Sequence, residues 1–237
     1  MLSFKQKEFN AAMLRYHDIK YYQLTYKVVS TINITLEIIL LYVLFTLSIP
    51  FIWIVPALII SYFIADFING LVHLYMDNND SYNTFYGAFV SSFHLHHKLQ
   101  KYKDNNLFLV YFNESGTKFW LIPYLGLTLS LSFTSLNDIV LFIMILTGIL
   151  SSFAEVSHYL CHNSNSKTVL FLQHLGLLLK KNHHKKHHQE DNIGYAFLNG
   201  MSDPLINKIA SKFYKGYKYN SDTHYQMYEG EGTLNRD

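Results

Sequence analysis

Long apolar runs separated by polar segments set the predicted fold. Val28–Leu47 carries one charged side chain, Glu37. At about 1.5 Å per residue, a helix of this length spans the roughly 30 Å of a bilayer core. Phe51–Tyr75 is a second run of this kind, and only the short, uncharged segment 48–50 separates the two. The pattern therefore predicts a hairpin of two transmembrane helices.

Two further apolar runs follow in the second half of the chain. Phe119–Phe133 is apolar over only 15 residues. A run this short predicts a re-entrant segment, a locally thinned bilayer or a helix extended at its ends. After a turn at Asn137-Asp138, Ile139–Cys161 is long enough to span. We therefore expect an all-α, multi-pass membrane protein with about four transmembrane helices.

The polar segments divide the chain around these runs. We expect a cytosolic N-terminal segment over residues 1–27, a membrane domain over 28–210 and a polar C-terminal tail over 211–237. Residues 76–118 have the composition of a loop, and the last nine residues, 229–237, that of a disordered end. The chain thus predicts a single membrane domain with polar ends.

Composition supports a membrane protein and excludes other classes. Charged residues make up 15 % of the chain, below the roughly 25 % of soluble domains. A net charge of +2 is too small to indicate a nucleic-acid partner. Cys161 is the one cysteine, so no internal disulfide can form. Thirteen histidines are the compositional anomaly.

The distribution of lysine predicts the orientation. The short turns at 48–50 and 134–138 contain no Lys or Arg. The other side carries Lys20, Lys27, Lys98, Lys101, Lys103, Lys118 and the lysines from Lys167 onward. The positive-inside rule then places both termini and every histidine cluster on the cytosolic side. The membrane would be the endoplasmic reticulum in a eukaryote and the inner membrane in a bacterium.

Ionisable residues recur at helical spacing along the second run. Asp66, His73 and Asp77 are seven and four residues apart, so they share one face of a helix. Such residues within or at the end of a spanning helix are costly in lipid and are functional candidates by default. Snorkelling to the headgroups would explain His73 alone, but Asp66 lies too deep for it.

The second half repeats this pattern. His158 and His162 are four residues apart, and Glu155 precedes His158 by three. The run His183–His188, with the sequence HHKKHH, places its four imidazoles within about 140° of one helical face. Alone, this run also fits a solvated basic segment. Together with the other clusters, it predicts a metal site at the membrane surface.

Eight histidines are predicted as metal ligands. They are His73, His96, His97, His158, His162, His184, His187 and His188. One ion accepts at most about six ligands, so the set predicts two metals. Imidazole suits iron, zinc and copper. Zinc would favour hydrolysis, yet the chain has no HExxH motif; two iron ions beside a bilayer favour O2 activation and attack on an unactivated C–H bond.

Four stretches resemble the Kua/CarF family of membrane lipid desaturases. A GDxxSGLxHxxxD-like stretch is matched by ADFINGLVHLYMD, residues 65–77. FxxHH is matched at 93–97 and HxxxH at 158–162. LQxxGLxL followed by HHxxHH is matched at 172–188, and an altered GWLNxPL segment at 195–205. The order and spacing agree over roughly residues 50–210.

The resemblance implies a di-iron site that uses O2 and removes hydrogens from a lipid chain. One branch of the family converts alkyl ether phospholipids to vinyl ether plasmalogens, as plasmanylethanolamine desaturases do. Another desaturates acyl chains near the carboxyl end. Electrons would come from a cytochrome b5-like or ferredoxin-like protein. The chain has no GxGxxG stretch for a nicotinamide or flavin of its own, so a separate donor is expected on the Lys-rich face.

Five other residues are candidates for supporting roles. Asp66, Asp77 and Glu155 are predicted as further ligands or as groups that orient imidazoles through the second ring nitrogen. His94 stands where the family has Arg and would add a ligand or replace a headgroup contact. Which of His183 and His184 ligates is left open.

Three rival functions were weighed against desaturation, and only hydroxylation fits the sequence equally well. Hydroxylation begins with the same hydrogen abstraction, so the sequence does not separate it from desaturation. A metal transporter or sensor would carry acidic and histidine residues through the midplane, whereas here they gather at one face. A catalytically inactive scaffold conflicts with the complete set of clusters.

Overall fold

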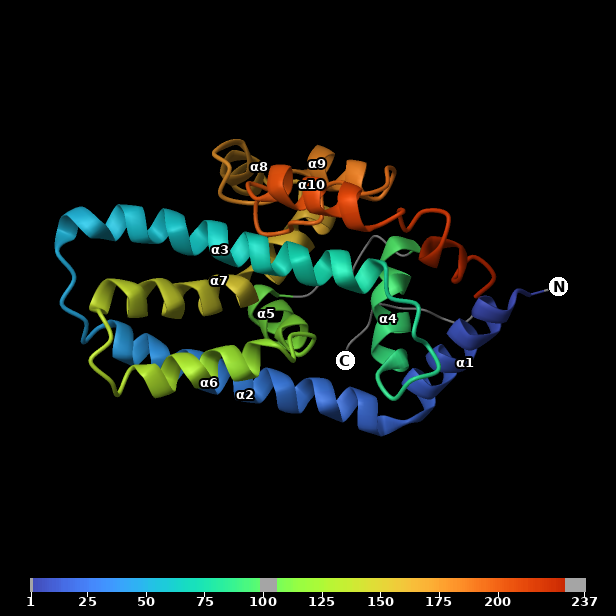
Figure 1. Ribbon diagram of the computed structural model, residues 1–237, viewed down its shortest axis with the longest axis horizontal. Coiled ribbons are helices and arrows are strands. Elements are labelled where there is room, and N and C mark those ends of the chain that lie inside the picture. Colours follow the sequence, from blue (N-terminus) through green and yellow to red (C-terminus); the bar gives the residue numbers. More distant parts are fainter. Residues whose placement is uncertain (1, 99–105, 229–237) are drawn as a thin grey trace.

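The computed structural model describes residues 2–98 and 106–228, and all secondary structure in these ranges is helical. The helices, in chain order, are α1 (Phe4–Asp18), α2 (Lys20–Leu44), α3 (Phe51–Asp77), α4 (Gly87–Lys98), α5 (Leu107–Ser115), α6 (Leu121–Leu131), α7 (Asp138–Asn163), α8 (Lys167–His174), α9 (Lys181–His187) and α10 (Asp203–Phe213), with a 3-10 turn at Ser221–Thr223 (Figure 1). The all-α prediction is confirmed. The disorder predicted for residues 229–237 lies outside the described residues.

Three of the described helices are long and apolar enough to cross a membrane, namely α2, α3 and α7. The fourth predicted span is the shorter apolar helix α6. At about 1.5 Å per residue, its 11 residues cover roughly half of a bilayer core. The prediction of about four spans therefore becomes three long helices and one short one.

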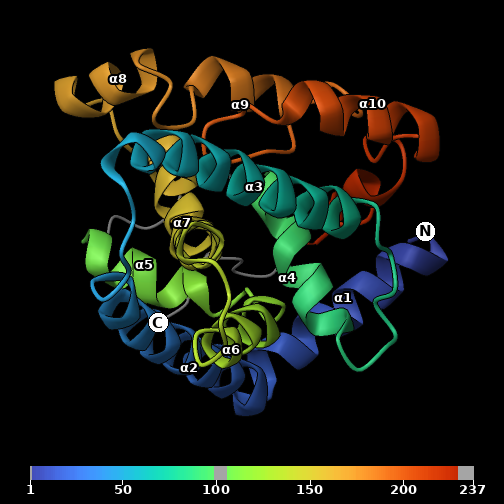
Figure 2. The same cartoon turned by 60° about the vertical axis from the view of Figure 1, so that its left-hand side comes forward.

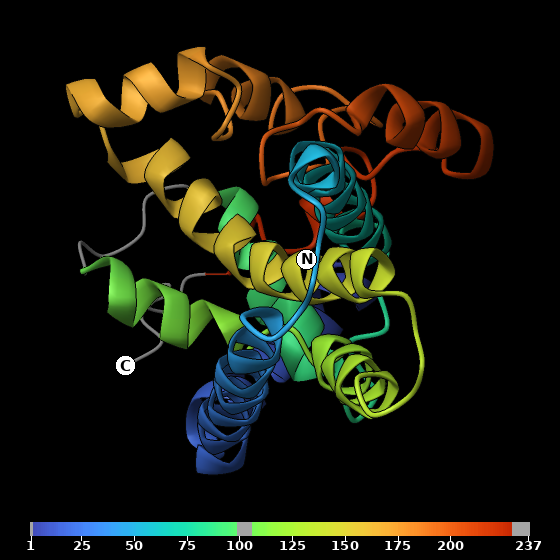
Figure 3. The ribbon, with the colours of Figure 1, turned by 90° about the vertical axis from the view of Figure 1, so that its left-hand side faces the viewer.

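The apolar helices form a bundle around α7. In the end-on view of Figure 3, α7 lies between α3 on one side and α2, α5 and α6 on the other, and it packs against all four. Leu40, Leu121, Leu125 and Ile145 form a buried core between α2, α6 and α7. The outer face of α3 exposes large apolar side chains such as Phe51 and Ile52, as expected for helices surrounded by lipid.

One charge inside the bundle has its partners within it. Glu37 lies on α2 and is buried. Its carboxylate accepts hydrogen bonds from Tyr111 on α5 (2.6 Å) and Ser152 on α7 (2.5 Å). The only charge in the first predicted span thus faces the protein interior and ties three helices together.

The polar segment 76–118 is not the loop that its composition suggested. It contains α4 and α5, and α4 packs against α1. Ala88, Val90 and Leu95 of α4 are buried against Phe9 and Met13 of α1. The expectation of a loop was wrong because α4 also buries its serines and histidines, which hides the apolar stripe that identifies a helix.

Helices α8, α9 and α10 form a layer over α3 and the end of α7 (Figures 1 and 2). Gly70 lets this layer approach α3 closely. A Cβ there would lie 2.3 Å from Ile206 Cδ1 and 3.1 Å from Ala196 Cα. Because only glycine leaves this space, the segment after α9 can lie directly against the histidine-bearing end of α3.

Candidate metal centre

The ends of four helices bring the predicted histidines together. His73 lies near the end of α3, His158 and His162 in the last turns of α7, and the others on α4 and at α9. Seven of the eight are 8 % exposed or less, and His162 is partly buried. Their donor atoms gather in three groups.

The first, the imidazole group, consists of His96, His158, His162 and His184, whose ligand atoms all lie within 4.8 Å of one another. The Nε2 atom of His158 lies 2.8 Å from that of His184 and 3.2 Å from that of His162. Two ligands about 2.1 Å from an ion and at right angles are about 3.0 Å apart. The spacing of these nitrogens is therefore that of neighbouring ligands on one ion.

The second, the carboxylate group, consists of His73, Asp77, His97 and His187. The Asp77 carboxylate lies at its centre, 3.4 Å from the Nε2 atoms of His73 and His187 and 3.1 Å from that of His97. These three nitrogens and both carboxylate oxygens are buried and make no hydrogen bond. Buried polar atoms left in this way are costly, so their convergence fits a bound cation.

A third set, the bridging group, links the other two. It contains His96, His97 and His188, so it shares one histidine with each group. The Nε2 atom of His188 also lies 3.0 Å from that of His184. The site is therefore continuous, with two ends and shared ligands between them.

The second ring nitrogens of the carboxylate group are fixed by oxygen acceptors. The Nδ1 atom of His73 donates to the Tyr195 carbonyl at 2.9 Å, and that of His187 donates to the Ile193 carbonyl at 3.0 Å. The Nδ1 atom of His97 donates to the Asp222 carboxylate at 2.9 Å. These bonds leave Nε2 facing the centre, as at metal-binding histidines generally.

Burial sets the protonation of the histidines on α4 and α9. It lowers the pKa of His96, His184, His187 and His188, and the neighbouring histidines lower it further. Neutral imidazole is the form that binds metals. At His97, burial is outweighed by Asp77 and Asp222, which raise its pKa to about 9. A cation at this position would displace that proton, so binding there is coupled to proton release.

Sequence comparison agrees with this geometry. Residues 62–217 match the lipid desaturase domain, which is more than half of the chain. The chain belongs to the lipid desaturase domain family. The match contains all eight histidines of the three groups and Asp77. No curated protein and no solved structure was found to be similar.

Membership makes this lipid desaturase an oxidoreductase of lipid metabolism that acts on lipid in a membrane. The predicted resemblance to lipid desaturases is confirmed at this level. The narrower Kua/CarF assignment stays a prediction. The histidine groups are compatible with metal binding, and their chemistry, imidazole with one carboxylate, suits iron as well as zinc.

Two predicted supporting residues of the desaturase, Asp66 and Glu155, lie outside the groups and have other partners. Asp66 accepts hydrogen bonds from the backbone of Leu198 (3.1 Å) and Ser202 (2.9 Å), so it holds the loop before α10. Glu155 forms an ion pair of 3.0 Å with Lys118. Spacing placed both on the correct face of their helices but did not reveal these partners.

His94 and His183 also have other partners. His94 donates from Nε2 to the Met76 carbonyl (2.7 Å), and its Nδ1 contacts the Tyr82 hydroxyl (2.8 Å). Both of its ring nitrogens are therefore engaged away from the groups. His183 pairs through Nε2 with Asp203. Of the neighbouring pair left open by the sequence, the structure thus brings His184 into the imidazole group.

Sequence reasoning missed Asp222, the carboxylate that holds His97. It lies in the predicted polar tail and is also bound by Lys218 at 2.7 Å. Burial opposes its ionisation, but the bonds to His97 and Lys218 lower its pKa. Its signal was weak, because a lone acidic residue 34 positions after the last ligand has no helical spacing to the motifs.

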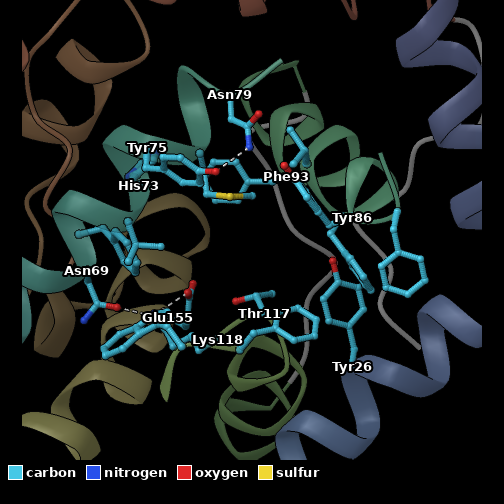
Figure 4. Close-up of a pocket in the computed structure, with 18 residues that line it drawn as sticks. Tyr26, Asn69, His73, Tyr75, Asn79, Tyr86, Phe93, Thr117, Lys118 and Glu155 are labelled. Carbon is cyan, nitrogen blue, oxygen red and sulfur yellow. Dashed lines mark hydrogen bonds and ion pairs between the residues drawn. The ribbon is translucent and has the colours of Figure 1, made fainter. Parts of the chain in front are cut away.

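A largely apolar cavity of about 290 Å³ lies beside the carboxylate group. His73, a member of that group, also lines the cavity. Aromatic side chains line its far end, among them Tyr26 and Tyr86 (Figure 4). At the end near His73, the figure shows a polar cluster of Asn69, Lys118 and Glu155. The cavity therefore runs from an aromatic end to a polar end close to the histidines.

Proposed function

We propose that the chain is an O2-dependent di-iron lipid desaturase whose active site faces the cytosol. Its most favoured reaction is the introduction of a vinyl ether double bond into alkyl ether phospholipids. The observation that carries the proposal is the arrangement of the donor atoms. Two groups of four donors, joined by His96, His97 and His188, supply more ligands than one ion accepts.

The balance of the reaction requires a reductant. Two iron ions held there would supply the reduction of O2 and the removal of hydrogen from the lipid. Converting one CH2–CH2 unit to CH=CH releases two electrons, and the reduction of O2 to two waters takes four. The remaining two electrons would come from a donor protein of the cytochrome b5 or ferredoxin type.

The chain's own residues supply binding and orientation. The carbonyls of Tyr195 and Ile193 and the Asp222 carboxylate hold three imidazoles in fixed positions. The largely apolar, aromatic lining of the cavity suits an apolar chain. Because His73 lines both the cavity and the carboxylate group, a chain in the cavity would lie beside the metals.

The test is lipid mass spectrometry in a host that lacks plasmalogens and is fed an alkylglycerol. Expression of the chain should yield acid-labile vinyl ether phospholipids, and the His187→Ala variant should yield none. A change confined to acyl unsaturation would favour an acyl-lipid desaturase instead, and hydroxylated products would favour a hydroxylase. Unchanged lipids, with the protein present in the membrane and loaded with iron, would contradict the proposal.

A further inference from the structure

Lys118 is a cation buried beside the site. It lies between α5 and α6 and is 3 % exposed, although its charge had predicted a cytosolic surface position. Its backbone is anchored, since the N–H donates to the Ser115 carbonyl and the carbonyl accepts from Asn33. The side chain extends into the cavity wall. A buried ammonium is costly, so its position calls for an explanation.

Within the part of the chain that the structure describes, two polar acceptors contact its ammonium group. An ammonium group donates three hydrogen bonds. Lys118 Nζ donates to Asn69 Oδ1 and pairs with Glu155 Oε1 at 3.0 Å. Nζ also lies 4.8 Å from the centroid of the Phe197 ring, which lines the same cavity. A donor is thus left at the polar end of an otherwise apolar cavity (Figure 4).

The two partners of this donor each lie about one helical turn before a ligand of a main group. Asn69 precedes His73 by four residues on α3, and Glu155 precedes His158 by three on α7. At about 1.5 Å per residue, these offsets are roughly 5 to 6 Å along each helix. The Phe197 ring is a neighbour of both the lysine and the histidines, since its centroid lies 4.8 Å from Lys118 Nζ and 5.5 Å from the ring centroids of His73 and His158.

We propose that Lys118 donates its third proton to an oxygen of the lipid, either an ether or a carbonyl oxygen, that lies next to the reacting carbons. The proposal rests on the function proposed above. An apolar chain alone can slide along an apolar cavity, whereas one hydrogen bond from a fixed cation sets its register. The position of the double bond is then counted from the oxygen and not from the methyl end.

The test isolates Lys118 from its partner. Each single neutral variant, Lys118→Met or Glu155→Gln, would leave one charge of the pair buried without its counter-ion, which is destabilising in itself. The informative variant is therefore Lys118→Met with Glu155→Gln, and Glu155→Gln, in which the ammonium keeps Asn69 as an acceptor, shows the effect of losing the carboxylate alone. Lys212→Met, at an exposed position of α10, is the control for loss of a lysine. Metal content and unfolding temperature show which variants remain folded.

The direct readout is binding to the purified full chain in nanodiscs. The probes are a hexadecyl alkylglycerol, the matching ester and the carba analogue with a methylene in place of the oxygen. A hydrogen bond from a charged donor predicts that wild-type protein, Glu155→Gln and Lys212→Met bind an oxygen-bearing probe about ten-fold or more tightly than the carba analogue. Whether the ether or the ester is preferred identifies the oxygen.

The double variant should lose this preference and, on an active substrate, raise KM and scatter the double bond over several positions. A folded double variant that still prefers the oxygen-bearing probe and still forms the double bond at one position would overturn the proposal. A wild-type protein that binds the oxygen-bearing probe and the carba analogue equally would also overturn it. If the preference depends on Lys118 but no lipid is desaturated, the oxygen site stands and the proposed function fails.

Discussion

The imidazole group and the carboxylate group are built differently, although α4 and α9 contribute a histidine to each. In the carboxylate group, Asp77 contacts three imidazoles, and oxygen acceptors fix the far nitrogens of those rings. In the imidazole group, nitrogens face nitrogens, with His158 Nε2 2.8 Å from His184 Nε2. The first arrangement places a carboxylate among imidazoles, whereas the second brings imidazole nitrogens within hydrogen-bond distance of one another.

This difference gives the two groups different sensitivities. Oxygen acceptors keep the carboxylate group in place before a metal binds, so it should hold its ion tightly and respond to loss of its supporting residues. The imidazole group includes His162, which is less buried than the other ligands. Variants that remove one group at a time therefore test whether the site holds two ions.

The largest effect is expected from loss of one ligand in each group. His184→Ala and His187→Ala should each lower desaturation at least about 1,000-fold, because both metals are needed for the reaction. His17→Ala, at an exposed position of α1, is the control and should be fully active. Activity is followed by product mass spectrometry. Substantial turnover by either variant would remove that histidine from the ligand set.

Asp77→Asn should have the next largest effect. The amide keeps the shape but loses the charge that three imidazoles face, so activity should fall at least about 100-fold, with loss of iron from the carboxylate group alone. Asp138→Asn, at the far end of α7, is the matched control. Wild-type iron content in Asp77→Asn would show that this carboxylate is not a ligand.

Asp222→Asn should weaken the site more mildly. The carboxylate acts through His97, and removal of such a partner typically costs about 10- to 100-fold in metal affinity. Metal affinity is measured by competition with a chelator of known strength. The His184→Ala background should show the same factor, since only the carboxylate group is affected. An effect confined to the imidazole group would contradict the assignment.

The smallest effect on the chemistry is expected at His94. The His94 ring bridges the Met76 carbonyl and the Tyr82 hydroxyl by two hydrogen bonds. His94→Gln disrupts this bridge, so the free energy of unfolding should fall by about 1–3 kcal/mol. Denaturant titration in micelles measures this change. Iron content should equal that of wild-type protein, and a loss of iron would restore His94 as a ligand.

The sequence predicted the apolar elements better than the cap around the site. The helices α2, α3 and α7 follow from length and apolarity alone. Helix α4 did not, because its buried histidines and serines read as polar surface. Spacing placed His73 and Asp77 on one face, but could not show that Asp77 lies among three imidazoles from three helices. The position of Asp222 beside the site, and that of Lys118, could not be predicted because their partners, His97 and Glu155, are distant in sequence and close only in the fold.

The most direct test of the account is the number of iron ions per chain. Purified wild-type protein and the variants His184→Ala and Asp77→Asn are analysed by inductively coupled plasma mass spectrometry after growth in iron-rich medium. We expect two irons in the wild-type chain and about one in each variant. A single ion in the wild-type chain that both variants lose, or zinc in place of iron, would contradict it.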